Sequence, residues 1–190
     1  MSAVVNWYEA KPAPLVFITG SESYLAGRAI RQIRQTLKEQ YPDLEISEIA
    51  DGEYRAGSLF DYASPSLFGE SRLVIIHGPA EGLKEDLKQY IDQPADSVSV
   101  VVRLSNLVGH SGAIRKELAK SALVVSCEEL KKDSERIDFV NKEFKQAKVS
   151  IEPTAVRALV QAFNTDLGEL GAACSQLAMN FEKVSIANVE

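Results

Sequence analysis

The sequence has 190 residues, of which 45% are hydrophobic and 25% are charged. This length and balance fit a globular chain of one or two domains, and they exclude a disordered tail, a collagen-like repeat and a disulfide scaffold. The formal net charge is −6. Because proteins that bind nucleic acid on their own usually carry a basic excess, any DNA contact here is expected to depend on a local patch or on partners.

The two cysteines, Cys127 and Cys174, form no CxxC motif and have no metal-ligand spacing. We expect two free, mostly buried thiols in a reducing cytoplasm and no bound metal. The first residues of the chain have neither a basic region nor a long apolar core, so no signal peptide is predicted. No apolar run approaches ~20 residues, so no membrane-spanning helix is predicted either.

Apolar runs alternate with amphipathic segments in the first two thirds of the chain. After a loose leader over residues 1–13, continuous apolar runs predict strands buried on both faces. These runs are Leu15–Thr19, Leu73–Ile76, Ser97–Leu104 and Leu123–Cys127. Alternation predicts an outer strand over Glu45–Ala50, and helices are expected over Tyr24–Glu39, Ala56–Tyr62, Leu83–Ile91 and Gly112–Lys120. This order predicts an α/β unit with a mostly parallel sheet over residues 14–130.

The pattern changes near Glu128–Lys132, after which no strand of comparable strength follows. Helices are predicted over Asp133–Ala147, Pro153–Phe163 and Leu167–Met179. The expected N-caps are Asp133 and either Thr165 or Asp166, and Pro153 suits a first helical turn. Residues 131–190 are therefore predicted to form a small all-helical domain.

The junction between the first buried strand and the first helix is where a phosphate-binding loop would lie. Counting GxxxxGK[ST] from Gly20 places Leu25, Ala26 and Gly27 at the second Gly, the Lys and the Ser/Thr. Leu25 is interpreted as a core contact instead. We interpret Gly20, Ser21, Glu22 and Leu25 as a degenerate loop that binds no nucleotide.

Other catalytic groups are missing as well. The acid that would hold Mg²⁺ should end a buried strand, but two such strands end in His77-Gly78 and Ser105-Asn106. The segment Gly109–Gly112 resembles part of a nucleophile elbow, yet Ala113 stands where the motif needs glycine. Ser111 is interpreted as a loop and helix N-cap residue. We predict no catalytic residue and no cofactor.

Arg28, Arg31 and Arg34 lie three residues apart on the first predicted helix. This spacing has two interpretations. The three side chains could follow a DNA backbone or contact another subunit, or they could form the solvent face of an amphipathic helix.

The segment Ser64–Arg72 is the most unusual in the chain. Leu67 and Phe68 are adjacent large apolar residues that follow a proline and precede Gly69. Adjacent residues on a helical turn point about 100° apart, so both rarely reach one core. On a surface turn they would form a two-pronged hydrophobic plug for a partner's pocket. Alternatively, Phe68 packs under the edge of the sheet.

Three blocks of the sequence, in this order, resemble the delta subunit family of bacterial DNA polymerase III. They are Gly20–Leu25 after the first strand, Ser66–Val74 entering the second buried strand, and Asn164–Leu170 with Gln176-Leu177 in the last helix. The resemblance covers nearly the whole chain from about Pro14. It implies an AAA+-like (P-loop NTPase-type) α/β domain and a helical lid domain. A helical collar domain would follow, which we expect to be absent from this chain.

The resemblance also implies a function without intrinsic catalysis. Delta is a non-catalytic subunit of a DNA-directed DNA polymerase (nucleotidyltransferase) holoenzyme. It lacks a working ATP site and opens the sliding clamp. A Leu-Phe pair of the family inserts into the clamp, and it maps onto Leu67 and Phe68, with Ser66 and Gly69 shaping the turn.

The implied partners are the sliding clamp, the other clamp-loader subunits and, through the assembled loader, DNA. No membrane contact is expected. The alternative function is a generic AAA+-like module that binds proteins or DNA.

Overall fold

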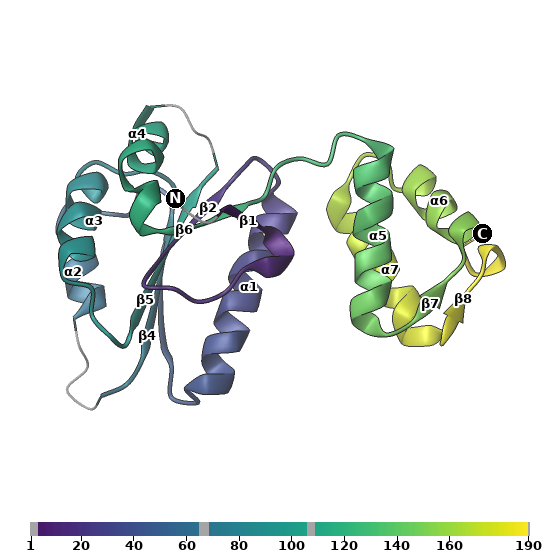
Figure 1. Cartoon of the computed structure of the whole chain (residues 1–190), viewed down its shortest axis with the longest axis horizontal. Helices are drawn as coiled ribbons and strands as arrows, with labels where there is room; N and C mark the ends of the chain where they lie inside the picture. Colours follow the sequence, from purple (N-terminus) through teal and green to yellow (C-terminus); the bar gives the residue numbers. More distant parts are fainter. Residues whose placement is uncertain (1–3, 65–68, 106–108, 190) are drawn as a thin grey trace. The chain divides into compact units, whose positions relative to one another are not determined.

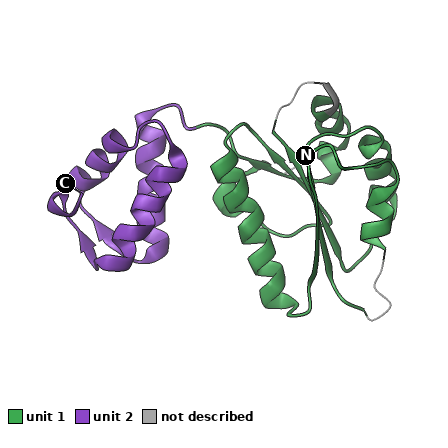
Figure 2. Cartoon of the chain, turned by 180° about the vertical axis from the view of Figure 1, so that it is seen from behind, with its two compact units in different colours: residues 1–129 green, residues 130–190 purple. Residues whose placement is uncertain are grey.

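The computed structural model describes residues 4–64, 69–105 and 109–189. They divide into two compact units, Met1–Glu129 and Leu130–Glu190 (Figure 2). The division falls inside the Glu128–Lys132 stretch where the sequence pattern changes.

Unit 1 is built on a six-stranded sheet in the order β1-β6-β2-β5-β4-β3, in which every described pair is parallel. The strands are β1 (Val4–Asn6), β2 (Leu15–Thr19), β3 (Glu45–Ile49), β4 (Arg72–His77), β5 (Val98–Leu104) and β6 (Leu123–Ser126). The five strands predicted from the sequence are confirmed, including β3 as an edge strand. Strand β2 is buried along its whole length, as a central parallel strand covered by helices on both sides requires.

Helices cover both faces of this sheet (Figure 1). Helix α1 (Ser23–Gln40) lies on one face, while α2 (Ser58–Ala63), α3 (Leu83–Asp92) and α4 (Gly109–Leu118) lie on the other. The face of α1 predicted to be apolar is buried, with Leu25, Ala29, Ile33 and Leu37 each at most 5% exposed. The α/β architecture expected from the sequence is therefore confirmed.

Residues 4–13 are not the loose leader that we expected. Val4–Asn6 pairs with Val124–Ser126 as the outermost strand of the sheet, and a 3₁₀ turn, η1 (Trp7–Glu9), follows it. Trp7 is buried, and the Arg28 guanidinium lies 5.4 Å from the centre of its ring. These contacts attach the beginning of the chain to unit 1. The sequence pattern did not indicate them because a three-residue edge strand leaves almost no periodic signal.

Helix α4 begins earlier than predicted, at Gly109 instead of Gly112. Ser111 therefore lies within the helix and is buried, so its interpretation as a loop or N-cap residue is wrong. Its hydroxyl has no hydrogen-bond partner among the residues that the structure describes. A short turn, η2 (Ala119–Ser121), connects the helix to β6.

Unit 2 contains the three predicted helices, α5 (Asp133–Ala147), α6 (Pro153–Ala162) and α7 (Leu167–Asn180). Asp166 is the N-cap of α7, accepting a hydrogen bond from the backbone N–H of Glu169 at 2.9 Å, and Pro153 opens α6. Asp133 is the first helical residue, not the N-cap, which is Lys132.

One feature of unit 2 was not indicated by the sequence. Two very short strands, β7 (Ser150–Ile151) and β8 (Lys183–Val184), pair in parallel. They connect the segment before α6 to the segment after α7. A final turn, η3 (Ile186–Asn188), follows them. The core of the unit consists of buried side chains from all three helices, among them Phe139, Val140, Phe144, Val156, Leu159 and Leu170.

Candidate functional site

The loop between β2 and α1 packs tightly against the backbone that follows β6. Gly20 has a φ of +104°, and a Cβ atom built on it would lie 2.3 Å from the carbonyl oxygen of Cys127. The backbone N–H of Glu22 donates to that same carbonyl at 3.0 Å. The backbone at Cys127 therefore lies directly beside Gly20 and leaves no room for a side chain at this position.

The N-terminus of α1 already carries a carboxylate. The Glu22 side chain accepts a hydrogen bond from the backbone N–H of Tyr24 at 3.0 Å. A helix N-terminus binds phosphate through such free N–H groups and the positive end of the helix dipole, and Glu22 competes for both. Leu25, at the position of the second glycine, is 1% exposed, and Ala26, at the position of the lysine, is 2% exposed. Both side chains are buried and apolar, so neither the glycine nor the lysine of a phosphate loop has a substitute here.

Arg103 is hydrogen-bonded to this loop. It lies in the central strand β5, is 7% exposed, and donates from Nη1 to the carbonyl of Gly20 at 2.8 Å. Burial lowers the pKa of Arg103, and burial also raises the pKa of the neighbouring Cys127 thiol to about 12. Arg103 is not among the functional residues predicted from the sequence. The available signal was an arginine within an otherwise apolar strand, since a charged residue is almost never fully buried without partners.

His77 ends β4 at the place where a magnesium-binding acid would be expected. Its Nε2 lies 2.7 Å from Oε1 of Glu48, and the other carboxylate oxygen of Glu48 lies 3.0 Å from Nη2 of Arg34. The hydrogen bond with His77, more than that with Arg34, lowers the pKa of Glu48. These three residues form a partly exposed cluster between α1 and two strands. Within the described part of the chain, no group of three His, Cys, Asp or Glu residues could hold a metal ion.

The three arginines of α1 have different surroundings. Arg28 stacks on Trp7 and donates to the hydroxyl of Tyr24 at 3.1 Å, whereas Arg34 pairs with Glu48. Arg31 is exposed. Arg28 and Arg34 lie about 120° apart around the helix axis, because each residue advances by about 100°. The predicted stripe is therefore divided between two sides of α1.

The Ser64–Arg72 segment is described only at its two ends, since residues 65–68, among them Ser66, Leu67 and Phe68, lie outside the described residues. Gly69 is exposed and has a φ of +77°, a conformation that favours glycine. Ser71 is buried, and its carbonyl accepts from the N–H of Glu45 at 3.0 Å. At the other end, the carbonyl of Ser64 accepts a hydrogen bond from Arg72. Both ends of the segment are thus attached to the sheet.

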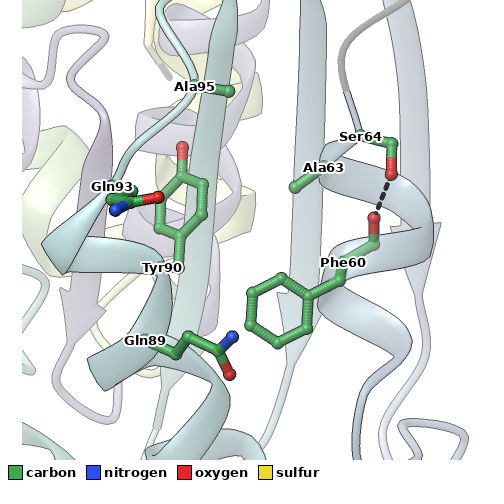
Figure 3. A pocket seen from close by; sticks show the side chains of 7 residues that line it. All are labelled: Phe60, Ala63, Ser64, Gln89, Tyr90, Gln93 and Ala95. Atoms are coloured by element: carbon green, nitrogen blue, oxygen red, sulfur yellow. Dashed lines mark hydrogen bonds between the residues drawn. The ribbon is translucent and has the colours of Figure 1, made fainter.

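A shallow cavity of about 390 Å³ lies beside Ser64, between α2 and α3. Figure 3 shows the ring of Phe60 on one side and the side chains of Gln89 and Tyr90 on the other. The remaining lining residues are Ala63, Gln93 and Ala95. All of these side chains are uncharged. The described lining therefore carries no charged side chain.

None of the described helices is long and apolar enough to cross a membrane. Both cysteines are buried, as predicted, and neither forms a disulfide within the described part of the chain.

Comparison with known proteins gives a family match and a set of similar folds. The model of the family described as DNA polymerase III, delta subunit, matches residues 17–128. A search of curated protein sequences found no match.

Several solved structures share the fold. The Bacillus subtilis DNA clamp loader delta protein (YqeN) has a TM-score of 0.70 at 22% identity, over 94% of this chain and 57% of that one. Domain III of the Thermotoga maritima replication initiation protein DnaA has a TM-score of 0.50 at 13% identity, over 92% and 81%. A point variant of Thermotoga maritima RuvB has a TM-score of 0.49 at 10% identity, over 92% and 59%.

The matches to the Bacillus subtilis protein and to DnaA domain III concern the fold alone, which is AAA+-like, as expected from the sequence. The chain spans a little over half of the Bacillus subtilis protein that it resembles.

Proposed function

Because the chain belongs to the family of DNA polymerase III delta subunits, we propose that it is a non-catalytic clamp-loader subunit that binds the sliding clamp and helps to open it. The observation that carries this proposal is the family match over residues 17–128, which includes the whole Ser64–Arg72 segment. Its partners would be the clamp, the other loader subunits and, through the assembled loader, DNA. Such a role belongs in the cytoplasm.

The clamp contact is assigned to Leu67 and Phe68, presented by the turn that includes Ser66 and Gly69. Support comes from the two ends of this segment. Ser64 is hydrogen-bonded to the first residue of β4, and Ser71 is hydrogen-bonded to the first residue of β3. Fixed ends reduce the ordering cost of binding. Burial of each apolar side chain in a partner's pocket contributes about 1.5–3 kcal/mol, enough for a binding hot spot.

Clamp opening then requires differential affinity. A subunit shifts the equilibrium between closed and open clamp only if it binds the open form more tightly. The chain itself supplies no ATP hydrolysis in this proposal. The proposed lack of ATP hydrolysis is supported by the packing of Gly20 against Cys127 and by the Glu22 carboxylate at the N-terminus of α1. ATP binding by other loader subunits would decide when the clamp-binding segment is accessible.

The test is binding of the purified chain to the sliding clamp of the same organism, measured by surface plasmon resonance. We expect the Leu67→Ala/Phe68→Ala variant to lose at least ~2 kcal/mol of binding free energy, or about thirtyfold in affinity. The matched control is Met179→Ala/Phe181→Ala, which removes an exposed apolar pair from unit 2, 82% and 39% exposed respectively. This control should bind as the unmodified chain does.

Equal binding by the plug variant and the unmodified chain would show that another surface contacts the clamp. If the unmodified chain binds DNA instead, with an affinity that falls steeply with salt, a DNA-binding module becomes the better description.

A further inference from the structure

Another cavity of unit 1, about 170 Å³ in volume, lies at the amino ends of the central strands. Its walls come from the segment before β2, the end of α1 and the beginnings of β4 and β5. Because these strands are parallel, this edge of the sheet is the one opposite to the Gly20 loop. A cavity of this size holds several water molecules or one small polar group.

The charge of this cavity comes from one carboxylate. Among the described residues that line it, Asp96 is the only charged one, and it is exposed. The Asp96 carboxylate has no hydrogen bond or ion pair with any other described residue. The uncharged polar part of the described lining includes Ser97 and Ser99. Since no described lysine or arginine lines the cavity, the negative charge of Asp96 is not balanced there.

The end of α1 adds negative potential to the same cavity. Gln40 and Tyr41 line it at the C-terminus of this 18-residue helix. The last carbonyls of a helix have no partner within the helix, and they carry the negative end of its dipole. Tyr41 donates its backbone N–H to the carbonyl of Leu37 at 2.8 Å, but the next residue, Pro42, has no N–H to donate. This end of α1 therefore favours a cation.

Tyr41 also brings an aromatic ring to the cavity, and the residue is 46% exposed. The face of an aromatic ring attracts cations. The ring also packs against the alkyl part of an organic cation, as it does against the stems of lysine and arginine. A metal ion would find only one carboxylate among the described lining residues, whereas an alkylammonium or guanidinium ion can use both the carboxylate and the ring.

We propose that this cavity binds an organic cation, an alkylammonium or guanidinium group, with Asp96 as its counter-ion and Tyr41 as its aromatic contact. The net charge of −6 favours the approach of such a ligand. Two sources carry this chemistry, namely the lysine or arginine side chain of a protein and a free amine. The proposal is independent of the proposed clamp contact, because it uses none of the residues assigned to that contact.

The first test titrates the ¹⁵N-labelled chain with n-butylammonium chloride and follows the amide signals of Gln40, Ser97 and Ser99 by NMR. We expect saturable shifts in the millimolar range. The control ligand is 1-butanol, which has the same alkyl chain without the charge and should bind at least about tenfold more weakly. Equal affinity for butanol, or no saturable shift with butylammonium, would overturn the proposal.

Two matched variants test the counter-ion. Asp96→Asn should weaken the binding of butylammonium about tenfold, because it removes the charge that pairs with the ligand. Asp138→Asn makes the same change of charge at an exposed position of α5, in unit 2, and should change the affinity less than about twofold. Equal losses in the two variants would mean that only the net charge of the chain matters, which contradicts a site at Asp96.

A second pair of variants tests the aromatic contact. Tyr41→Phe keeps the ring and should bind butylammonium as the unmodified chain does, whereas Tyr41→Leu should lose about threefold in affinity. Equal affinities of these two variants would contradict the role of the ring.

Spermidine and a blocked tripeptide with a central lysine distinguish the two sources in the same titration. Tighter binding of the tripeptide identifies a protein side chain as the ligand, and tighter binding of spermidine identifies a free amine. In either case Asp96→Asn should weaken the binding about tenfold. If Asp96→Asn leaves the binding of both ligands unchanged, the cation lies elsewhere on the chain and the proposal fails.

Discussion

At the scale of single residues, two glycines of the first unit have opposite roles. Gly20 has a positive φ and touches the Cys127 backbone, so no side chain fits there without a backbone shift. Gly27 lies in the second turn of α1, where it is exposed, and a Cβ atom added to it would meet nothing within 4 Å. The first is required by the packing of the β2–α1 loop, whereas the second only weakens the helix.

We expect Gly20→Ala to lower the free energy of unfolding by about 2–4 kcal/mol, from the strained backbone and the overlap with Cys127. The matched control, Gly27→Ala, should raise it by about 0.5–1 kcal/mol, because alanine is the better helix former. Equilibrium urea unfolding of both variants measures the difference. A Gly20→Ala variant as stable as the unmodified chain would show that the loop can move away from Cys127 without cost.

At the scale of secondary-structure elements, the β2–α1 junction determines whether unit 1 can bind a nucleotide. In this chain the junction is occupied by protein groups on three sides. Glu22 caps the helix, Cys127 packs against Gly20, and Arg103 donates to the carbonyl of Gly20. The sheet is AAA+-like, whereas the groups at this junction contact one another, which favours the prediction that the junction binds no nucleotide.

Isothermal titration with ATP and Mg²⁺ should therefore give no saturable binding at millimolar nucleotide. The physical reason is that a triphosphate would meet the Glu22 carboxylate at the helix N-terminus without a lysine to offset its charge. A protein with a complete phosphate-binding loop, titrated under the same conditions, serves as the positive control. Saturable binding of ATP would contradict the interpretation of Gly20–Leu25 as a degenerate loop.

At the scale of the whole molecule, the chain consists of two units that each have a core of their own. Strand β6 is the last element of unit 1, and it lies between β1 and β2 in the sheet. The division after Glu129 therefore leaves the sheet complete. A division before Leu123 would remove an internal strand and expose the edge of β2.

A fragment of residues 1–129 is expected to unfold cooperatively, with a stability within about 1 kcal/mol of that of unit 1 in the full chain. A fragment of residues 1–122, which lacks β6, should not fold cooperatively, because β1 loses its only described partner strand and β2 loses one of two. Thermal unfolding followed by circular dichroism compares them. If residues 1–129 fail to fold alone, the two units depend on each other for stability.

The sequence by itself determined most of the elements and their order. Strands such as Leu15–Thr19 are continuous apolar runs, and the apolar residues of α1 recur with a period near 3.6 residues. The pattern of each segment was therefore sufficient to assign it. The absence of a complete phosphate-binding loop also followed from single residue types, since Leu25 and Gly27 cannot supply the chemistry of the missing residues.

The tertiary structure decided what those patterns do not encode. The edge strand Val4–Asn6 and the two-residue strands β7 and β8 exist because distant segments complete their hydrogen bonds, and such short segments have no periodicity of their own. The burial of Ser111 within α4 and of Arg103 beneath the Gly20 loop likewise depends on neighbours far away in the sequence. The bond from Arg72 to Ser64 belongs to the same class. A local pattern reports which residues prefer which backbone conformation, whereas contacts between distant residues depend on how the elements pack.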